Sequence, residues 1–145
     1  MIKIQQSSYS SICRDEVGFD SYEHSLEVAA NYPPQWADYF ELSSFFRTCE
    51  FWGAGQADPV ENQAVVSDVP ALIFAGHFDP ITTPEWSQLA AETLSHSFYF
   101  EFPNMGHGVM RADPCALRIG LQFLDDPRNE PDASCLAELT LPDFR

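Results

Sequence analysis

The chain has 145 residues, enough for one domain with a sizeable core, and its 45% hydrophobic content excludes an intrinsically disordered protein. Twenty-two acidic residues against seven basic ones give a formal net charge of −15 at pH 7, which makes nucleic acids and anionic membranes poor partners. No apolar run approaches the roughly 20 residues of a membrane-spanning helix. The first residues, MIKIQQSSYSS, lack the basic start and apolar centre of a signal peptide.

The first part of the chain predicts short helices between irregular segments. Residues 1–20 show no strong period and are expected to form a weak strand or a loop. A short helix is predicted over 21–30, where Ser21 can cap it, and a second over 35–47, after the paired prolines of NYPPQ. The second helix carries a broad apolar stripe, typical of core or lid packing, made of Trp36, Tyr39, Phe40 and residues 42–46. Residues 49–69 are expected to form a loop.

The second part of the chain is more regular. Residues 72–75 are continuously apolar, the pattern of a buried strand in a parallel sheet. A helix is predicted after them, with Thr83 as its N-cap and Pro84 at its first position. Residues 97–102, SFYFEF, predict a second strand, and residues 103–113 predict a loop.

The last predicted helix begins at Asp113-Pro114 and carries Leu117, Leu121 and Leu124 along one face. The resulting order is strand, helix, strand, helix. This order predicts an α/β fold with parallel strands and a right-handed crossover.

Two candidate functional residues follow the two predicted strands: Asp79 the first, and His107 the second. Functional groups gather at the carboxyl ends of strands in open parallel sheets, and neighbouring strands lie about 4.8 Å apart. We therefore expect the Asp79 carboxylate within hydrogen-bonding reach of the His107 imidazole. There it would fix the ring tautomer and stabilise the imidazolium formed during proton abstraction. Gly106 and Gly108 flank His107 and permit an unusual backbone.

Simpler interpretations of these residues remain open. An aspartate followed by Pro80 can serve only to shape a turn. His77 would allow a zinc site together with Asp79 and His107, but no supporting pattern accompanies it, and no metal is predicted.

Two histidines and three acidic residues outside these motifs are given no catalytic role. The histidines are assigned to surface or boundary positions. The acidic residues could attract the free amino terminus of a substrate, although solvated loop charges are the simpler interpretation. The five residues are His24, His96, Asp15, Glu16 and Glu50.

The four cysteines, Cys13, Cys49, Cys115 and Cys135, are too widely spaced for CxxC metal or redox motifs. Cys115 lies in the first turn of the last predicted helix, and a polar, proline-containing segment follows that helix. A helix of about ten residues rises about 15 Å and a ten-residue loop spans about 30 Å, so Cys135 can return to Cys115. That pairing leaves Cys13 with Cys49. Free buried cysteines are the alternative.

The stretches PALIFAGHFDPITTP (70–84) and FPNMGHGV (102–109) resemble the C-terminal part of α/β-hydrolase-fold serine hydrolases. More narrowly, they resemble tripeptidyl-aminopeptidase-like and proline-iminopeptidase-like peptidases, strongly over residues 68–124 and loosely over 13–52. In that family the chain order is nucleophile, acid, base, which implies that Asp79 is the acid and His107 the base. The implied fold is a partial α/β-hydrolase fold, with a helical lid-like segment and connection over 1–67 and the last parallel strands with their helices over 68–145.

The contexts of the cysteines, CRDE, CEFW, DPCALRIGLQFL and ASCL, resemble the secreted branch of this family and imply an extracytoplasmic location. The resemblance implies no cofactor, and its substrates would be peptides or small amides and esters. The substrate-binding residues stay unassigned.

No G-x-S-x-G nucleophile elbow occurs in the chain, and Ser87, Ser95 and Ser97 are not expected on a strand-to-helix elbow. The chain alone is therefore expected to be inactive. One hypothesis is an aminopeptidase-type serine peptidase whose serine lies outside these residues; the alternative is a non-catalytic hydrolase-like fragment or binding domain. An in-frame elbow in the upstream coding sequence would favour the first. Missing strands would leave an exposed sheet edge, which predicts self-association.

Overall fold

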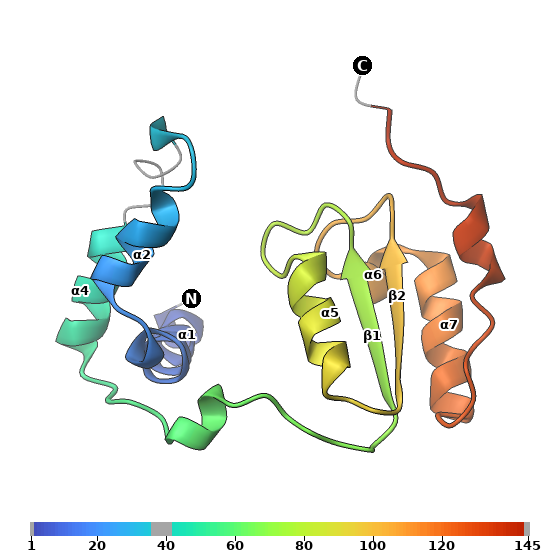
Figure 1. Cartoon of the computed structure of the whole chain (residues 1–145), viewed down its shortest axis with the longest axis horizontal. Coiled ribbons are helices and arrows are strands. Elements are labelled where there is room, and N and C mark those ends of the chain that lie inside the picture. Colours follow the sequence, from blue (N-terminus) through green and yellow to red (C-terminus); the bar gives the residue numbers. More distant parts are fainter. Residues whose placement is uncertain (1, 36–41, 144–145) are drawn as a thin grey trace. The chain divides into compact units, whose positions relative to one another are not determined.

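The computed structural model describes residues 2–35 and 42–143 and divides into two compact units, Met1–Gln63 and Ala64–Arg145 (Figure 1). The first unit is helical and the second combines helices with a parallel sheet. Within the described part of the chain, none of the helices has both the length and the apolar character needed to cross a membrane.

The first unit begins with helix α1 (Ile2–Asp15), so the expected weak strand or loop over residues 1–20 is wrong. The serine-rich sequence has little helical preference of its own, and packing against helix α4 (Leu42–Trp52) stabilises it instead. Cys13 of α1 forms a disulfide with Cys49 of α4. In addition, the Trp52 indole donates a hydrogen bond of 3.0 Å to the Ser10 hydroxyl.

Helix α2 (Tyr22–Ala29) forms as the sequence predicts, with the Ser21 hydroxyl accepting a hydrogen bond from the backbone N–H of His24. The second predicted helix is only partly testable, since Trp36, Tyr39 and Phe40 lie outside the described residues.

Helix α4 runs on to Trp52, whereas residues 49–52 were expected in a loop. The sequence there contains no helix breaker, and the chain leaves the helix at Gly53, whose φ of 63° is the left-handed conformation typical of a helix end. One short 3-10 helix, Val17–Phe19, follows α1. A second one, Pro59–Asn62, lies within the segment that was expected to form a loop.

The second unit is built on two parallel strands, β1 (Ala71–Gly76) and β2 (Ser97–Phe102), joined through helix α5 (Pro84–Glu92). The register places Leu72 opposite Phe98 and Gly76 opposite Phe102. The α/β class, the parallel pairing and both strands are thus confirmed, with each strand within one residue of its predicted limits.

Two further helices follow β2. The short helix α6 (Val109–Ala112) forms inside the segment expected to be a loop, and α7 (Pro114–Asp125) begins at its predicted residue. Asp113 caps α7, because its carboxylate accepts hydrogen bonds from the backbone N–H groups of Cys115 and Ala116.

The core of the second unit lies between β2 and α7. Phe102, Ala116 and Ile119 are fully buried there, and Phe100 and Val109 are nearly so. The opposite face of β2 lies toward α5, where Gln88 of α5 donates a hydrogen bond to the hydroxyl of Tyr99. The two helices therefore pack on opposite faces of the sheet.

The leucines of α7 share a face, as predicted, but that face points outward. Leu117, Leu121 and Leu124 are 46%, 52% and 68% exposed, whereas Ile119 is fully buried. A Cβ at Gly120 would lie 2.7 Å from the Met110 methyl group, so the buried face of α7 is packed tightly at that point. The packed face of this helix is therefore formed by Cys115, Ala116, Ile119 and Gly120.

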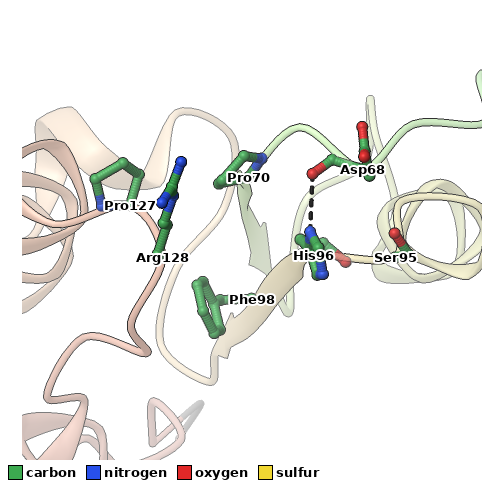
Figure 2. A pocket seen from close by; sticks show the side chains of 8 residues that line it. Asp68, Pro70, Ser95, His96, Phe98, Pro127 and Arg128 are labelled. Carbon is green, nitrogen blue, oxygen red and sulfur yellow. Dashed lines mark hydrogen bonds between the residues drawn. The ribbon is translucent and has the colours of Figure 1, made fainter.

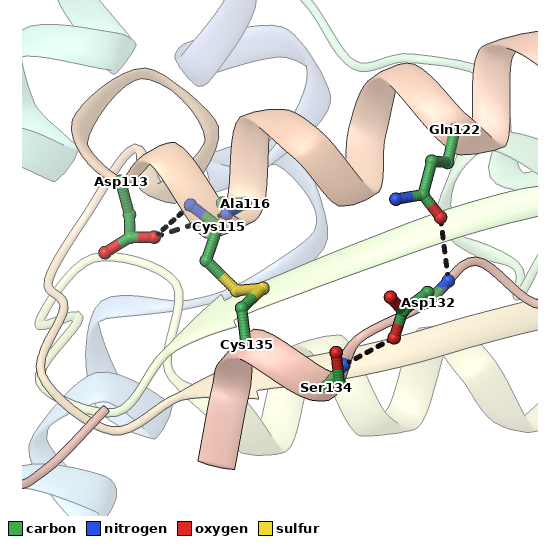
Figure 3. The surroundings of a disulfide bond; sticks show 7 residues. All are labelled: Asp113, Cys115, Ala116, Gln122, Asp132, Ser134 and Cys135. Atoms are coloured by element: carbon green, nitrogen blue, oxygen red, sulfur yellow. Dashed lines mark hydrogen bonds between the residues drawn. A yellow bond between two sulfur atoms is a disulfide. The ribbon is translucent and has the colours of Figure 1, made fainter. Parts of the chain in front are cut away.

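A disulfide joins Cys115 at the start of α7 to Cys135 in a short 3-10 helix, Ser134–Glu138 (Figure 3). Two hydrogen bonds also hold the returning segment. The backbone N–H of Asp132 donates to the Gln122 side chain, and the backbone N–H of Ser134 donates to the Asp132 carboxylate. Both disulfides pair as the sequence predicted, and the structure describes no free cysteine.

Candidate functional site

Asp79 lies in a tight turn directly after β1, and it is buried although it is charged. Its Oδ1 atom accepts hydrogen bonds from the backbone N–H groups of Ile81 (2.8 Å) and Thr82 (3.1 Å). Its Oδ2 atom accepts one from the Thr82 hydroxyl (2.8 Å). This is the turn geometry that aspartate side chains favour, and here it holds the carboxylate in one orientation.

His107 lies in the loop after β2, and its Nδ1 atom is 2.9 Å from Asp79 Oδ2. The predicted contact between the two strand ends is therefore confirmed. Because an ionised carboxylate can only accept a hydrogen bond, Nδ1 carries the proton and Nε2 is left with a free lone pair. The His107 side chain is 54% exposed and that of Asp79 only 6%, so the ring is accessible while its carboxylate partner is shielded.

The loops that carry the two residues are in direct backbone contact. The backbone N–H of His77 donates to Phe102 O (3.0 Å), and that of Phe78 donates to Met105 O (2.9 Å). A Cβ at Gly76 would collide with the carbonyl oxygen of Gly106 and lie 2.8 Å from that of Met105. Glycine at position 76 is therefore required for this close approach.

The surroundings of Asp79 keep it ionised. Burial by itself would raise its pKa, but hydrogen bonds from the Ile81 and Thr82 backbone, from His107 and from the Thr82 hydroxyl together lower the pKa well below its usual range. A charged carboxylate next to Nδ1 stabilises a protonated imidazole. The pair can thus accept a proton at Nε2 of His107.

An open cavity of about 290 Å³ lies beside the pair. Its walls combine the two candidate side chains with apolar residues and one arginine. The lining residues are Phe74, Asp79, Thr82, His107, Gly108, Val109, Met110 and Arg111. The cavity leaves room next to the imidazole for a reacting group.

Within the described residues, the His107 ring is hydrogen-bonded to Asp79 and Thr82. Ser87 is on α5, and Ser95 and Ser97 lie at the amino end of β2, whereas His107 follows its carboxyl end. Ser95 and Ser97 therefore lie at the opposite end of the strand from His107.

A second cavity, of about 610 Å³, lies at the amino ends of the strands (Figure 2). His96 and Arg128 line it, and the Nδ1 atom of His96 is hydrogen-bonded to the carbonyl oxygen of Asp68 at 2.8 Å. Neither Asp79 nor His107 lines this cavity. It is thus separate from the candidate site.

The remaining candidates have other partners or lie in the first unit. His77 pairs with Glu101, with 2.7 Å between Nδ1 and Oε1, and the described residues contain no group of three or more metal-ligating side chains. His24 is exposed and pairs with Asp20. Asp15, Glu16 and Glu50 all belong to the first unit, and their interaction with a substrate amine stays a prediction.

Thr82 was not predicted from the sequence to be a partner of Asp79. The available signal was a hydroxyl residue three positions after an aspartate, a spacing at which the side chain can return to the carboxylate.

Comparison with known proteins gives a family for the chain. A family model described as TAP-like protein, from the α/β-hydrolases, matches residues 34–135. The comparisons with curated proteins and with solved structures give no match.

Proposed function

Because the chain belongs to the TAP-like family of α/β-hydrolases, we propose that it is the part of a serine hydrolase that carries the acid, Asp79, and the base, His107. The proposed enzyme is an aminopeptidase-type peptidase that cleaves peptides or small amides and esters by acyl transfer. The present residues would form its C-terminal portion, with a helical lid-like segment and connection over 1–67 followed by the part over 68–145 that carries the acid and the base. The proposed chemistry uses side chains alone and needs no cofactor.

The observation that carries this proposal is the 2.9 Å contact between His107 Nδ1 and the buried Asp79 carboxylate. With Nδ1 committed to Asp79, Nε2 would take the hydroxyl proton of a serine as its oxygen attacks the substrate carbonyl. The imidazolium would then give that proton to the leaving amine as the amide bond breaks. Water would release the acyl group by the same route, with His107 again acting as the base.

The serine would come from polypeptide outside these 145 residues. The cavity beside His107 leaves room for it. Strand β1 supports the same idea, since it is continuously apolar yet residues 71–74 are only half-buried, and within the described residues β1 pairs with β2 alone. Strands of this composition are typically covered on both faces and paired on both edges, so a further strand along β1 would complete the sheet. Without it, we expect the chain to self-associate through this edge.

The disulfides support a proposal for the location of the enzyme. Two disulfides, Cys13–Cys49 and Cys115–Cys135, are consistent with an extracellular protein. We therefore propose an extracytoplasmic or secreted enzyme.

The test compares the 145-residue chain with the same chain extended by its upstream coding sequence, using fluorogenic aminoacyl amides, tripeptidyl amides and short-chain esters. The chain alone should be silent, because its sequence contains no G-x-S-x-G elbow to supply the nucleophile and the backbone donors for the oxyanion. The extended chain should hydrolyse at least one substrate class. An extended chain that contains a serine elbow and is silent on every substrate would contradict the proposal and favour a binding domain.

A further inference from the structure

We infer that Thr82 is a positioning residue of the Asp79–His107 pair, because its hydroxyl holds the carboxylate oxygen that His107 contacts. The inference rests on the proposed function, since it concerns the same site. Its test is chosen so that the two can fail separately.

Two polar side-chain atoms contact Asp79 Oδ2. The Thr82 hydroxyl donates to this oxygen at 2.8 Å, and His107 Nδ1 lies 2.9 Å from the same oxygen. The Thr82 hydroxyl oxygen is itself 3.4 Å from His107 Nδ1. Because its hydrogen points to the carboxylate, its lone pairs are available to the Nδ1–H group. Thr82 therefore contacts both members of the pair.

The second oxygen of Asp79 is already fixed by backbone groups, the N–H of Ile81 and that of Thr82. Because a carboxylate is rigid, these bonds also restrain Oδ2, although they do not contact it. The Thr82 hydroxyl adds a bond made directly to the oxygen that faces the imidazole. A reacting group whose orientation is fixed in advance loses less entropy when it acts, so the hydroxyl should favour the aligned pair.

The neighbouring Thr83 provides a matched control. It occupies the N-cap position of α5, yet its side chain makes no capping hydrogen bond with the helix backbone; its hydroxyl interacts with the Glu85 side chain instead. A substitution of valine for threonine keeps the shape and the backbone N–H at either position. Only at position 82 does it remove a contact with the site.

The experiment measures, by NMR on the 145-residue chain, the rate at which the Nδ1–H hydrogen of His107 exchanges with water. Thr82→Val and Thr82→Ala should speed this exchange several-fold, because Oδ2 no longer stays aligned with Nδ1. Thr82→Ser keeps a hydroxyl and should preserve the slow exchange, and Thr83→Val should not change it. The Asp79 carboxyl signal should show a higher pKa in Thr82→Val and Thr82→Ala, since one donor to the charged form is lost.

Asp79→Asn tests the Asp79–His107 pair separately from the role of Thr82. If it leaves the exchange unchanged, the Asp79–His107 pair itself fails, and with it the proposed function. If Asp79→Asn speeds exchange while Thr82→Val and Thr82→Ala do not, the inference on Thr82 is wrong and the pair stands. A serine variant that exchanges as fast as the valine variant would also contradict the inference.

Discussion

The backbone of Gly76 lies so close to the carbonyl oxygen of Gly106 that a side chain at position 76 would collide with it. Gly76→Ala should therefore push apart the loops that carry Asp79 and His107. We expect a loss of about 1–3 kcal/mol in the free energy of unfolding, the usual range for overpacking, and faster solvent exchange of the His107 Nδ1–H. Denaturant unfolding and NMR would measure the two effects.

Gly106→Ala is the control for this prediction. A Cβ at that position meets only Phe78 O, at an ordinary 3.6 Å, so the variant should stay near the wild type. Equal stability of the two alanine variants would show that the close approach does not constrain the site.

The buried charge of Asp79 predicts a pH dependence of stability. In the folded chain its pKa is lowered from the ordinary value of 3.8. The folded state therefore binds the Asp79 proton less tightly than the unfolded state does. The stabilisation is fully present above pH 3.8 and decreases as the pH falls below that value toward the folded pKa. Asp79→Asn should reduce the slope of unfolding free energy against pH in this acid range.

Asp125→Asn removes one negative charge at the exposed end of α7 and serves as the control for this slope. An acid slope that is the same in wild type, Asp79→Asn and Asp125→Asn would mean that the folded structure does not hold the Asp79 charge.

The disulfide between Cys115 and Cys135 spans 20 residues of sequence. In the chain-entropy account, a loop of this size stabilises the folded state by about 3 kcal/mol. The double variant Cys115→Ala, Cys135→Ala should lose a similar amount on denaturant unfolding of the second unit. Mass spectrometry of the unreduced protein should find both bridges, and four free thiols would contradict the pairing and the extracytoplasmic location together.

Helix α7 offers a direct comparison of buried and exposed apolar residues. Ile119→Ala should cost about 2–5 kcal/mol, because the fully buried side chain leaves a cavity. Leu121→Ala, on the outward face and 52% exposed, should cost less than about 1 kcal/mol. Thermal and denaturant unfolding would measure both, and a larger loss for Leu121→Ala would mean that the helix packs through its leucine face.

The second unit was predictable because its signals are local. The apolar run of β1, the Thr83-Pro84 start of α5 and the Asp113-Pro114 start of α7 each specify an element within a few residues. The site followed from topology, since Asp79 and His107 end adjacent parallel strands.

The error on α1 and the features that were not predicted arose where tertiary contacts decide the structure. Helix α1 depends on packing and a disulfide to α4, which its serine-rich sequence does not reveal. The leucines of α7 share a face, but only packing shows that Ile119 and Gly120 form the buried one. Thr82 was overlooked because DPITTP also fits a helix start, and the pattern does not say which threonine turns back to Asp79.

The most direct measurement of the central claim is the rate of hydrolysis by the extended chain with and without His107. His107→Ala and Asp79→Asn should each lower kcat/KM by orders of magnitude, because the serine loses its base or the base loses its orienting carboxylate. His96→Ala, in the separate cavity at the other end of the sheet, should leave kcat/KM close to that of the unchanged extended chain. Hydrolysis that survives His107→Ala undiminished would contradict the account and place the active site elsewhere.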